Sequence, residues 1–237
     1  MLRSQWLKLV MILNLFFFFS ASARNSMQKR TVVEEVATRS ILSFDVFEPK
    51  TYSHHHGLQL YISNYNKMQE EVFQLIRKRD KAKLKLMAKV FRSYKLPAEL
   101  KYMAIVESEL KSAAVSKVGA AGVWQLMPST ALQLGLKIDS TIDERQNLQK
   151  STKAAALYLR DLHRTFNDWS LAVAAYNCGP GPVYKAIKKA GSRNYWELQQ
   201  FLPKETRHHV KKLMATQIYF EGASSLTGNY DGALARK

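Results

Sequence analysis

The chain has 237 residues, of which 36 are Lys or Arg and 19 are Asp or Glu, so its formal net charge is +17. A single cysteine, Cys178, excludes an intramolecular disulfide, so the fold depends on its hydrophobic core. About 200 residues suffice for one well-buried domain. The positive charge favours association with a polyanion, such as nucleic acid, an anionic membrane surface or a carboxylate-bearing polymer.

Residues 1–23 have the composition of an export signal. Arg3 and Lys8 give a positive start, residues 9–19 are apolar apart from one Asn, and residues 21–23 are small, as a cleavage site requires. The apolar run is too short for a membrane-spanning helix, which takes about 20 residues, and no cysteine lies near it to carry a lipid. We therefore expect a cleaved signal peptide, a mature chain in the periplasm or cell envelope, and no integral membrane anchor.

Cleavage after residue 23 would leave 34 basic and 19 acidic residues, a net charge near +15. Export argues against a nucleic-acid partner, and none is expected. Residues 24–56 show poor periodicity, which predicts an extended arm. Three consecutive histidines at 54–56 suggest metal ligands, but no second cluster follows at a supporting spacing. A solvated loop is the better interpretation, and neither a metal nor a cofactor is expected.

Two amphipathic stretches, 58–78 and 82–91, lie in a region of N-terminal helices that we expect over 57–95. Apolar residues recur in both at spacings of three and four, which predicts helices. The apolar stripe of the first stretch contains Tyr61, Tyr65, Met68, Val72, Leu75 and Ile76.

The run 98–110, which follows Pro97, also has helical character. At about 100° per residue, Leu100, Met103 and Glu107 fall on one face, so the carboxyl group of Glu107 extends an apolar stripe. Loss of solvation there favours a protonated carboxyl group, as a general acid requires. The alternative is a carboxylate that caps the helix end or pairs with a lysine.

The segment 115–128 combines small residues, among them Gly119 and Gly122, with bulky and partly polar side chains. Small residues permit the backbone to approach other groups closely. We therefore expect a loop that lines a groove.

The remainder of the chain reads as helices joined by short connections. We expect helices over 128–135, 148–166, 169–176, 183–190, 196–201 and 205–220, with a break at Gly179-Pro180-Gly181-Pro182. The connection 136–147 carries Asp139, Asp143 and Glu144. No stretch alternates as a strand does, so the fold is expected to be all-α, or nearly so, with a tail over 222–237.

Four motifs occur in an order and at spacings that resemble the lytic transglycosylases of the goose-lysozyme-like superfamily. They are Glu107-Ser108, Ser116-x-x-Gly119-Ala120-x-Gly122-x-x-Gln125-x-Met127-Pro128, Ala175-Tyr176-Asn177 and Pro203-x-Glu205-Thr206-Arg207. The resemblance covers roughly residues 96–221 and implies a single lysozyme-like catalytic domain there. Some relatives carry C-terminal LysM repeats, and none is recognised here.

The resemblance implies an enzyme that acts on peptidoglycan glycan strands. In that family a lone Glu protonates the oxygen between N-acetylmuramic acid and N-acetylglucosamine and then acts as base toward the C6 hydroxyl of the muramoyl sugar. The hydroxyl closes on C1 to give a 1,6-anhydro end, so no second carboxylate is needed, unlike in most glycoside hydrolases. Glu107 matches that Glu. The resemblance implies substrate contacts for Ser108, Ser116, Gln125, Met127, Tyr176, Asn177 and Glu205.

Several residues depart from the family pattern. Trp124 stands where relatives often have Met, so that it either enlarges a stacking platform for sugar rings or alters the packing beneath them. His209 replaces the more usual Tyr after Glu-Thr-Arg, which leaves any hydrogen bond there open. Pro182 removes one potential polar contact, and Cys178 is interpreted as a packing residue.

Two alternatives remain at this point. A goose-type lysozyme would hydrolyse the same bond with a water held by extra acids, for which Asp139, Asp143 and Glu144 are candidates by position. A non-catalytic peptidoglycan-binding protein would need neither Glu107 nor Tyr176.

Overall fold

The computed structural model describes residues 56–222. The expected signal peptide, the arm up to residue 55 and the tail from residue 223 lie outside the described residues. Within 56–222 the regular structure is helical, and the only β pairing consists of isolated bridges. This confirms the expected fold class for the described part. None of its helices is both long and apolar enough to cross a membrane.

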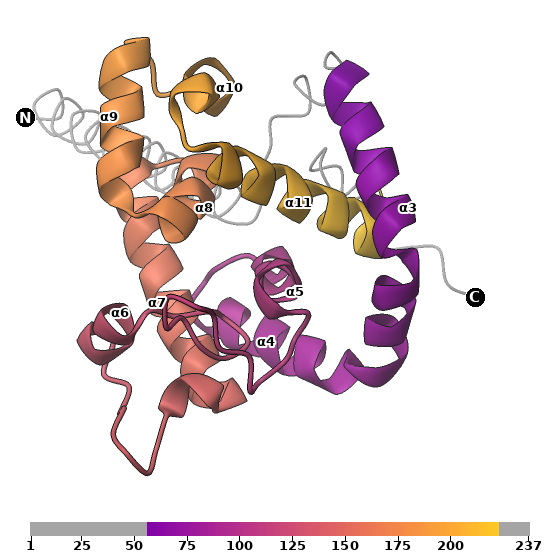
Figure 1. Cartoon of the computed structure of the whole chain (residues 1–237), viewed down its shortest axis with the longest axis vertical. Coiled ribbons are helices and arrows are strands. Elements are labelled where there is room, and N and C mark those ends of the chain that lie inside the picture. Colours follow the sequence, from indigo (N-terminus) through magenta and orange to yellow (C-terminus); the bar gives the residue numbers. More distant parts are fainter. Residues whose placement is uncertain (1–55, 223–237) are drawn as a thin grey trace, which may run out of the picture. The chain divides into compact units, whose positions relative to one another are not determined.

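The first two described helices are α3 (His56–Arg79) and α4 (Lys81–Ser93), as the amphipathic stretches predicted (Figure 1). α3 packs against the last helix, α11 (Lys204–Glu221). The expected stripe of α3 was wrong at two positions, because Met68 is 71% exposed and Leu75 is 61% exposed. Both lie away from the face that contacts α11.

The helix expected over 98–110 is a 3-10 segment, Ala98–Tyr102, followed by α5 (Met103–Ser108). It ends two residues earlier than expected, because Glu109 and Leu110 adopt left-handed backbone conformations with φ of 53° and 63°. The reversal turns the side chain of Leu110 into the core, where it is fully buried. Tertiary burial therefore decides where this helix ends.

The remaining helices follow the expected order. They are α6 (Pro128–Gln133), α7 (Leu148–Phe166), α8 (Trp169–Cys178), α9 (Pro180–Ala190), α10 (Tyr195–Leu198) and α11, with 3-10 segments at Glu144–Gln146 and Gln199–Phe201. The four-residue break at 179–182 was wrong, because α9 begins at Pro180 and Gly179 alone makes the turn with φ of 81°. Proline is tolerated in a first turn, where N–H groups have no helical partner.

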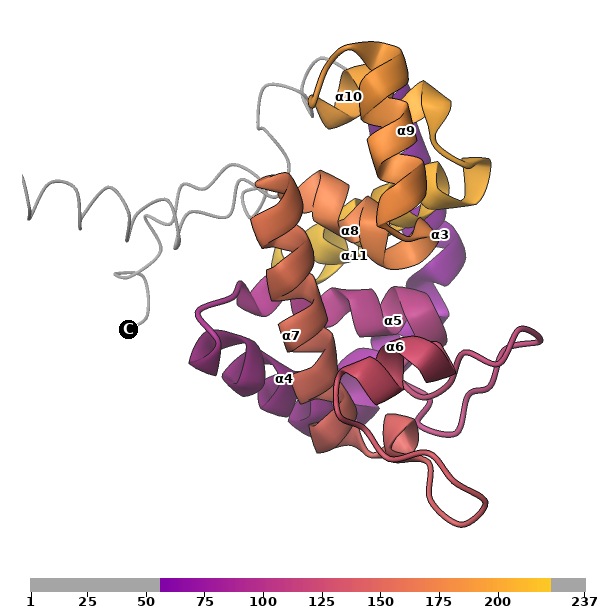
Figure 2. The same ribbon diagram turned by 90° about the vertical axis from the view of Figure 1, so that its left-hand side faces the viewer.

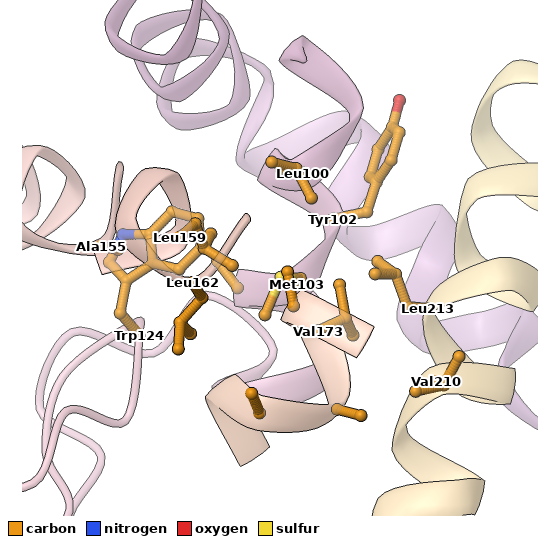
Figure 3. Packing of buried hydrophobic residues seen from close by; sticks show 14 of the residues in the cluster. Leu100, Tyr102, Met103, Trp124, Ala155, Leu159, Leu162, Val173, Val210 and Leu213 are labelled. Carbon is orange, nitrogen blue, oxygen red and sulfur yellow. The ribbon is translucent and has the colours of Figure 1, made fainter. Parts of the chain in front are cut away.

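The core joins these helices around α5. Figure 3 shows Met103 between Leu100 and Val173, with Leu213 of α11 facing them. In Figures 1 and 2, α7 runs from the neighbourhood of α8 and α9 to that of α4 and α6. The same hydrophobic cluster includes Phe73 of α3, so it extends across the boundary expected at residue 95.

Candidate active site

A cavity of about 680 Å³, the main cavity, is bordered by α5, the α5–α6 loop (109–127), α8 and α11. It brings together most of the residues that the motifs predicted. Its lining includes Glu107, Ser116, Gln125, Met127, Tyr176, Asn177 and Glu205. Ser108 is not among the lining residues. Four motifs that span about a hundred residues of sequence therefore meet at one place.

Glu107, at the C-terminal end of α5, forms a pair with His209 of α11. The Oε1 atom of Glu107 lies 2.8 Å from Nε2 of His209, and the two side chains are 14% and 7% exposed. No other hydrogen bond within residues 56–222 involves this carboxyl group, so Oε2 is left for a ligand. The pairing occupies Oε1 and fixes the orientation of the carboxyl group, and therefore the position of Oε2.

The surroundings of His209 indicate which ring nitrogen donates to Glu107. Its Nδ1 atom is buried and has no hydrogen-bond partner among the described residues. A hydrogen on Nδ1 alone would bury an unsatisfied N–H donor there and turn the lone pair of Nε2 toward the carboxyl oxygen. With its hydrogen on Nε2, the ring donates to Glu107. We therefore assign this tautomer from the hydrogen-bond network.

The α5–α6 loop is tied to α5 by Ser108. The hydroxyl group of Ser108 donates to the carbonyl oxygen of Val123 at 3.0 Å and to that of Ala104 at 3.3 Å. These bonds anchor the end of the helix that carries Glu107. Ser108 thus stabilises the position of Glu107, although it does not itself line the main cavity.

Gly122 allows the loop to approach the backbone of Arg145. A Cβ atom at this position would lie 1.9 Å from the carbonyl oxygen of Arg145, and its φ is 78°. The Arg145 guanidinium in turn donates to the carbonyl oxygens of Gly119, at 2.7 Å, and Leu126, at 3.0 Å. A buried arginine therefore holds the shape of the loop, which confirms the close approach expected from the small residues.

Ser116 and Gln125 present polar groups from this loop to the cavity. The Ser116 hydroxyl accepts a hydrogen bond from the Ala120 N–H at 3.0 Å. The amide nitrogen of Gln125 donates to the carbonyl oxygens of Ala114 and Gly122, at 3.2 and 3.0 Å. The loop uses the amide nitrogen, so the amide oxygen of Gln125 is the atom left for a ligand.

Tyr176 of α8 connects the cavity wall to the loop. Its hydroxyl group donates to the carbonyl oxygen of Trp124 at 2.7 Å. Burial raises the pKa of the Tyr176 phenol well above its usual value, and the negative charge of Glu107 adds to the shift. The phenol therefore stays protonated and remains a donor at any physiological pH.

Trp124 itself is fully buried, and its indole N–H donates to the hydroxyl group of Thr152 at 3.0 Å. Its ring meets Phe91 edge-on with centroids 5.4 Å apart. Figure 3 shows it against Ala155 and Leu159 of α7. The stacking platform considered for this residue was wrong, because its ring is buried in the core.

Three further residues predicted to contact the substrate also line the main cavity. The Asn177 side-chain oxygen accepts a hydrogen bond from the Thr206 hydroxyl at 2.8 Å, which joins α8 to α11. Glu205 is exposed in the first turn of α11. Met127, at the start of α6, is 41% exposed. Basic side chains from α11 complete this side of the cavity, namely Lys204, His208 and Lys212.

The acids considered for holding a hydrolytic water have other partners. Asp143 accepts hydrogen bonds from the Arg145 guanidinium, which lowers the pKa of this carboxyl group. Glu144 binds the Lys137 N–H and pairs with Lys150. Asp139 accepts from the backbone of Thr141 and the next residue, and none of the three acids lines the main cavity.

Sequence reasoning missed two features of this site. The contact of His209 with Glu107 was left open, although His209 lies two residues after the last motif, where the family pattern has Tyr. The role of Arg145 had no signal in the sequence, because it depends on a fold that brings 119, 126 and 145 together. Within residues 56–222 no group of three His, Cys, Asp or Glu side chains gathers as metal ligands would.

Comparisons with known proteins concern the part of the chain that carries most of this site. Residues 88–199 match the family model described as the transglycosylase SLT domain. The chain is 42% identical over 125 residues to the membrane-bound lytic murein transglycosylase D of Escherichia coli, covering 51% of this chain and 27% of that relative. The chain thus spans about a quarter of that relative's length.

Two solved structures share the fold. The 70 kDa soluble lytic transglycosylase of Escherichia coli gives a TM-score of 0.50 with 25% identity, over 58% of this chain and 25% of that chain. An inactive Glu-to-Gln mutant of the lytic transglycosylase Slt from Pseudomonas aeruginosa gives 0.50 with 26% identity, over 60% and 24%. Residues 88–199 therefore form a transglycosylase SLT domain, which places this part of the chain among the lytic transglycosylases.

Proposed function

We propose that this protein is a peptidoglycan lytic transglycosylase, a carbon-oxygen lyase that cleaves the β-1,4 bond between N-acetylmuramic acid and N-acetylglucosamine. The observation that carries the proposal is the largely buried carboxyl group of Glu107 in the main cavity. Its Oε1 atom pairs with His209, and its Oε2 atom is available to a ligand. Of the two carboxyl groups that line this cavity, only Glu107 is shielded from solvent, since Glu205 is exposed. One shielded carboxyl group suits a reaction with an internal nucleophile.

The reaction has two proton transfers through Oε2 of Glu107. The protonated carboxyl group gives its proton to the glycosidic oxygen as the bond from that oxygen to C1 of the muramoyl sugar breaks. The resulting carboxylate takes the proton of the C6 hydroxyl group, and O6 bonds to C1. Glu107 ends as it began, and no water is consumed. Intramolecular attack is fast because effective molarities reach about 10⁵ M or more.

His209 is a positioning residue in this scheme. Its Nε2–H group donates to Oε1 of Glu107 in both protonation states of the carboxyl group and so keeps Oε2 directed at the sugar. The bond strengthens when the carboxylate forms, because hydrogen bonds to charged acceptors are stronger. Tyr176 orders the opposite wall through Trp124.

The glycan contacts follow from the cavity lining. Ser116, the amide oxygen of Gln125 and Asn177 supply polar groups for sugar hydroxyl and N-acetyl groups. Met127 supplies an apolar surface, and Glu205 stands at the rim. Ser108 acts on the end of α5 through Val123. We place the mature protein in the periplasm or cell envelope, supported by the composition of residues 1–23 and by the murein-lytic relative.

Mass spectrometry of muropeptides released from purified peptidoglycan tests the proposal. The mature protein should release products that end in 1,6-anhydromuramic acid, lighter by one water than reducing ends. Glu107→Gln should release none. Glu109→Gln is the matched control, because Glu109 lies two residues away, pairs with Lys111 and does not line the main cavity.

Two outcomes of this experiment would overturn the proposed function. Reducing-end products would identify a hydrolase. This alternative is weakened by the hydrogen bonds and ion pairs that Asp139, Asp143 and Glu144 make elsewhere. Absence of any release, with retained binding to peptidoglycan, would identify a binding protein.

A further inference from the structure

A second cavity of about 490 Å³ lies at the start of α11. Its walls share Lys204 and His208 with the main cavity, so the two adjoin along this helix. None of the glycan contacts predicted from the sequence lines it. Its lining includes Trp196, Gln199, Lys204, Arg207, His208 and Lys211.

Basic side chains dominate this second cavity. Lys204, Arg207, His208 and Lys211 are spaced by three and four residues, so they emerge from one face of α11. No carboxyl group lines the second cavity. None of the ion pairs formed within residues 56–222 uses Lys204, Arg207 or Lys211. The positive charge of this face is therefore uncompensated by the described part of the chain.

Burial, and then the charge of neighbouring cations, disfavours the charged forms of two of these side chains. Burial lowers the pKa of Lys211, and the charge of Arg207 lowers it further. Burial also lowers the pKa of His208, with added repulsion from Lys204, Lys211, Lys212 and Arg207. A bound anion would relieve this repulsion, so the cavity is electrostatically suited to one.

Two of these side chains are ordered by α3. The Lys211 ammonium lies 5.9 Å from the centroid of the Tyr61 ring, within the range of a cation–π contact. The His208 ring lies 5.9 Å from the same ring. Packing of this kind reduces the side-chain entropy that binding would otherwise cost.

We propose that the second cavity binds carboxylate groups of the peptide stem that the muramoyl sugar carries, with Arg207 and Lys211 as the main contacts. This inference rests on the proposed function, because the stem branches from the sugar that reacts in the main cavity. The shared wall at Lys204 and His208 favours a ligand joined to the glycan over a separate phosphate polymer. Gln199 donates its amide nitrogen to the Trp196 carbonyl group at 3.2 Å, which leaves its amide oxygen for a peptide N–H.

Binding to the intact mature chain carrying Glu107→Gln tests the proposal by calorimetry, because this variant leaves the glycan uncleaved. The probes are a peptidoglycan tetrasaccharide with its peptide stems, the same tetrasaccharide with the stems removed, and inorganic polyphosphate. The added changes are Arg207→Gln with Lys211→Gln. Lys85→Gln with Lys89→Gln is the matched control, because it removes the same charge from exposed positions on α4 that line neither cavity.

The double change at 207 and 211 should weaken binding of the stem-bearing glycan about tenfold, or about 1.4 kcal/mol. Binding of the stem-free glycan should stay within twofold, as should both affinities of the control. Lys211→Arg alone should keep the affinity, because it keeps the charge.

Equal losses for both glycans, or none, would overturn the stem site and leave the proposed function intact. A dependence on these cations seen with polyphosphate alone would assign the cavity to phosphate instead. If the Glu107→Gln chain bound neither glycan, the proposed function itself would be refuted.

Discussion

The pair of Glu107 and His209 yields the sharpest prediction, because one hydrogen bond can be removed at nearly constant volume. His209→Phe keeps a ring in the buried site and removes the donor that lies 2.8 Å from Oε1. His209→Tyr keeps a ring with a donor, and Tyr is the more usual residue at this position in the resembled family. The two variants differ by a single hydroxyl group.

The expected magnitude follows from the burial and charge of the pair. A hydrogen bond to a charged group contributes about 1.5–3 kcal/mol. If His209→Phe loses this amount in the transition state, kcat should fall about 10- to 150-fold. KM should stay within about twofold, since in this scheme His209 acts through Glu107 and not on the sugar. His209→Tyr should recover most of the lost kcat.

The assay is the rate of 1,6-anhydro product formation from soluble glycan strands, with kcat and KM determined separately. A thermal unfolding scan of each variant shows whether the fold is kept, since a merely structural role would lower Tm and leave kcat of the folded fraction unchanged. Full kcat in a folded His209→Phe variant would refute the positioning role. A rise in KM with unchanged kcat would instead make His209 a substrate contact.

Two further predictions concern the loop that shapes the main cavity. Gly122→Ala should lower the free energy of unfolding by at least about 2 kcal/mol, because its Cβ would meet the Arg145 carbonyl oxygen at 1.9 Å. Gly119→Ala is the control in urea unfolding, since its φ is 86° but its Cβ would meet nothing within 4 Å, so it should cost only about 1 kcal/mol of backbone strain. Equal losses of unfolding free energy in the two variants would refute the clash at Gly122. For Asp143 the pKa is lowered in the folded state from 3.8 by its bonds to Arg145. The pair's stabilisation is thus complete above about pH 5 and lost as the pH falls through 3.8 toward the folded value. Urea midpoints at pH 5 and pH 3 should differ more for the native chain than for Asp143→Asn, and an equal difference would count against the pair.

Much of the helical framework was predictable because local signals and burial agree in it. The helix expected over 148–166 is α7 without change, since Asn147 caps it and Asn167 ends it in a left-handed conformation. Exceptions occur where tertiary packing outweighs local preference. Leu110 turns inward and shortens α5, whereas Pro180 begins α9 instead of interrupting it.

The sequence by itself identified the candidate acid and its motifs, because Glu107 and its companions are recognised by residue type and spacing. Only the tertiary structure decided their partners. Nothing in the order of residues places Nε2 of His209 at 2.8 Å from Glu107, or hides Trp124 while leaving Gln125 at the cavity. Such contacts depend on the packing of α5 against α11 and on the path of a loop held by Arg145, and both are set by the whole core rather than by any local pattern.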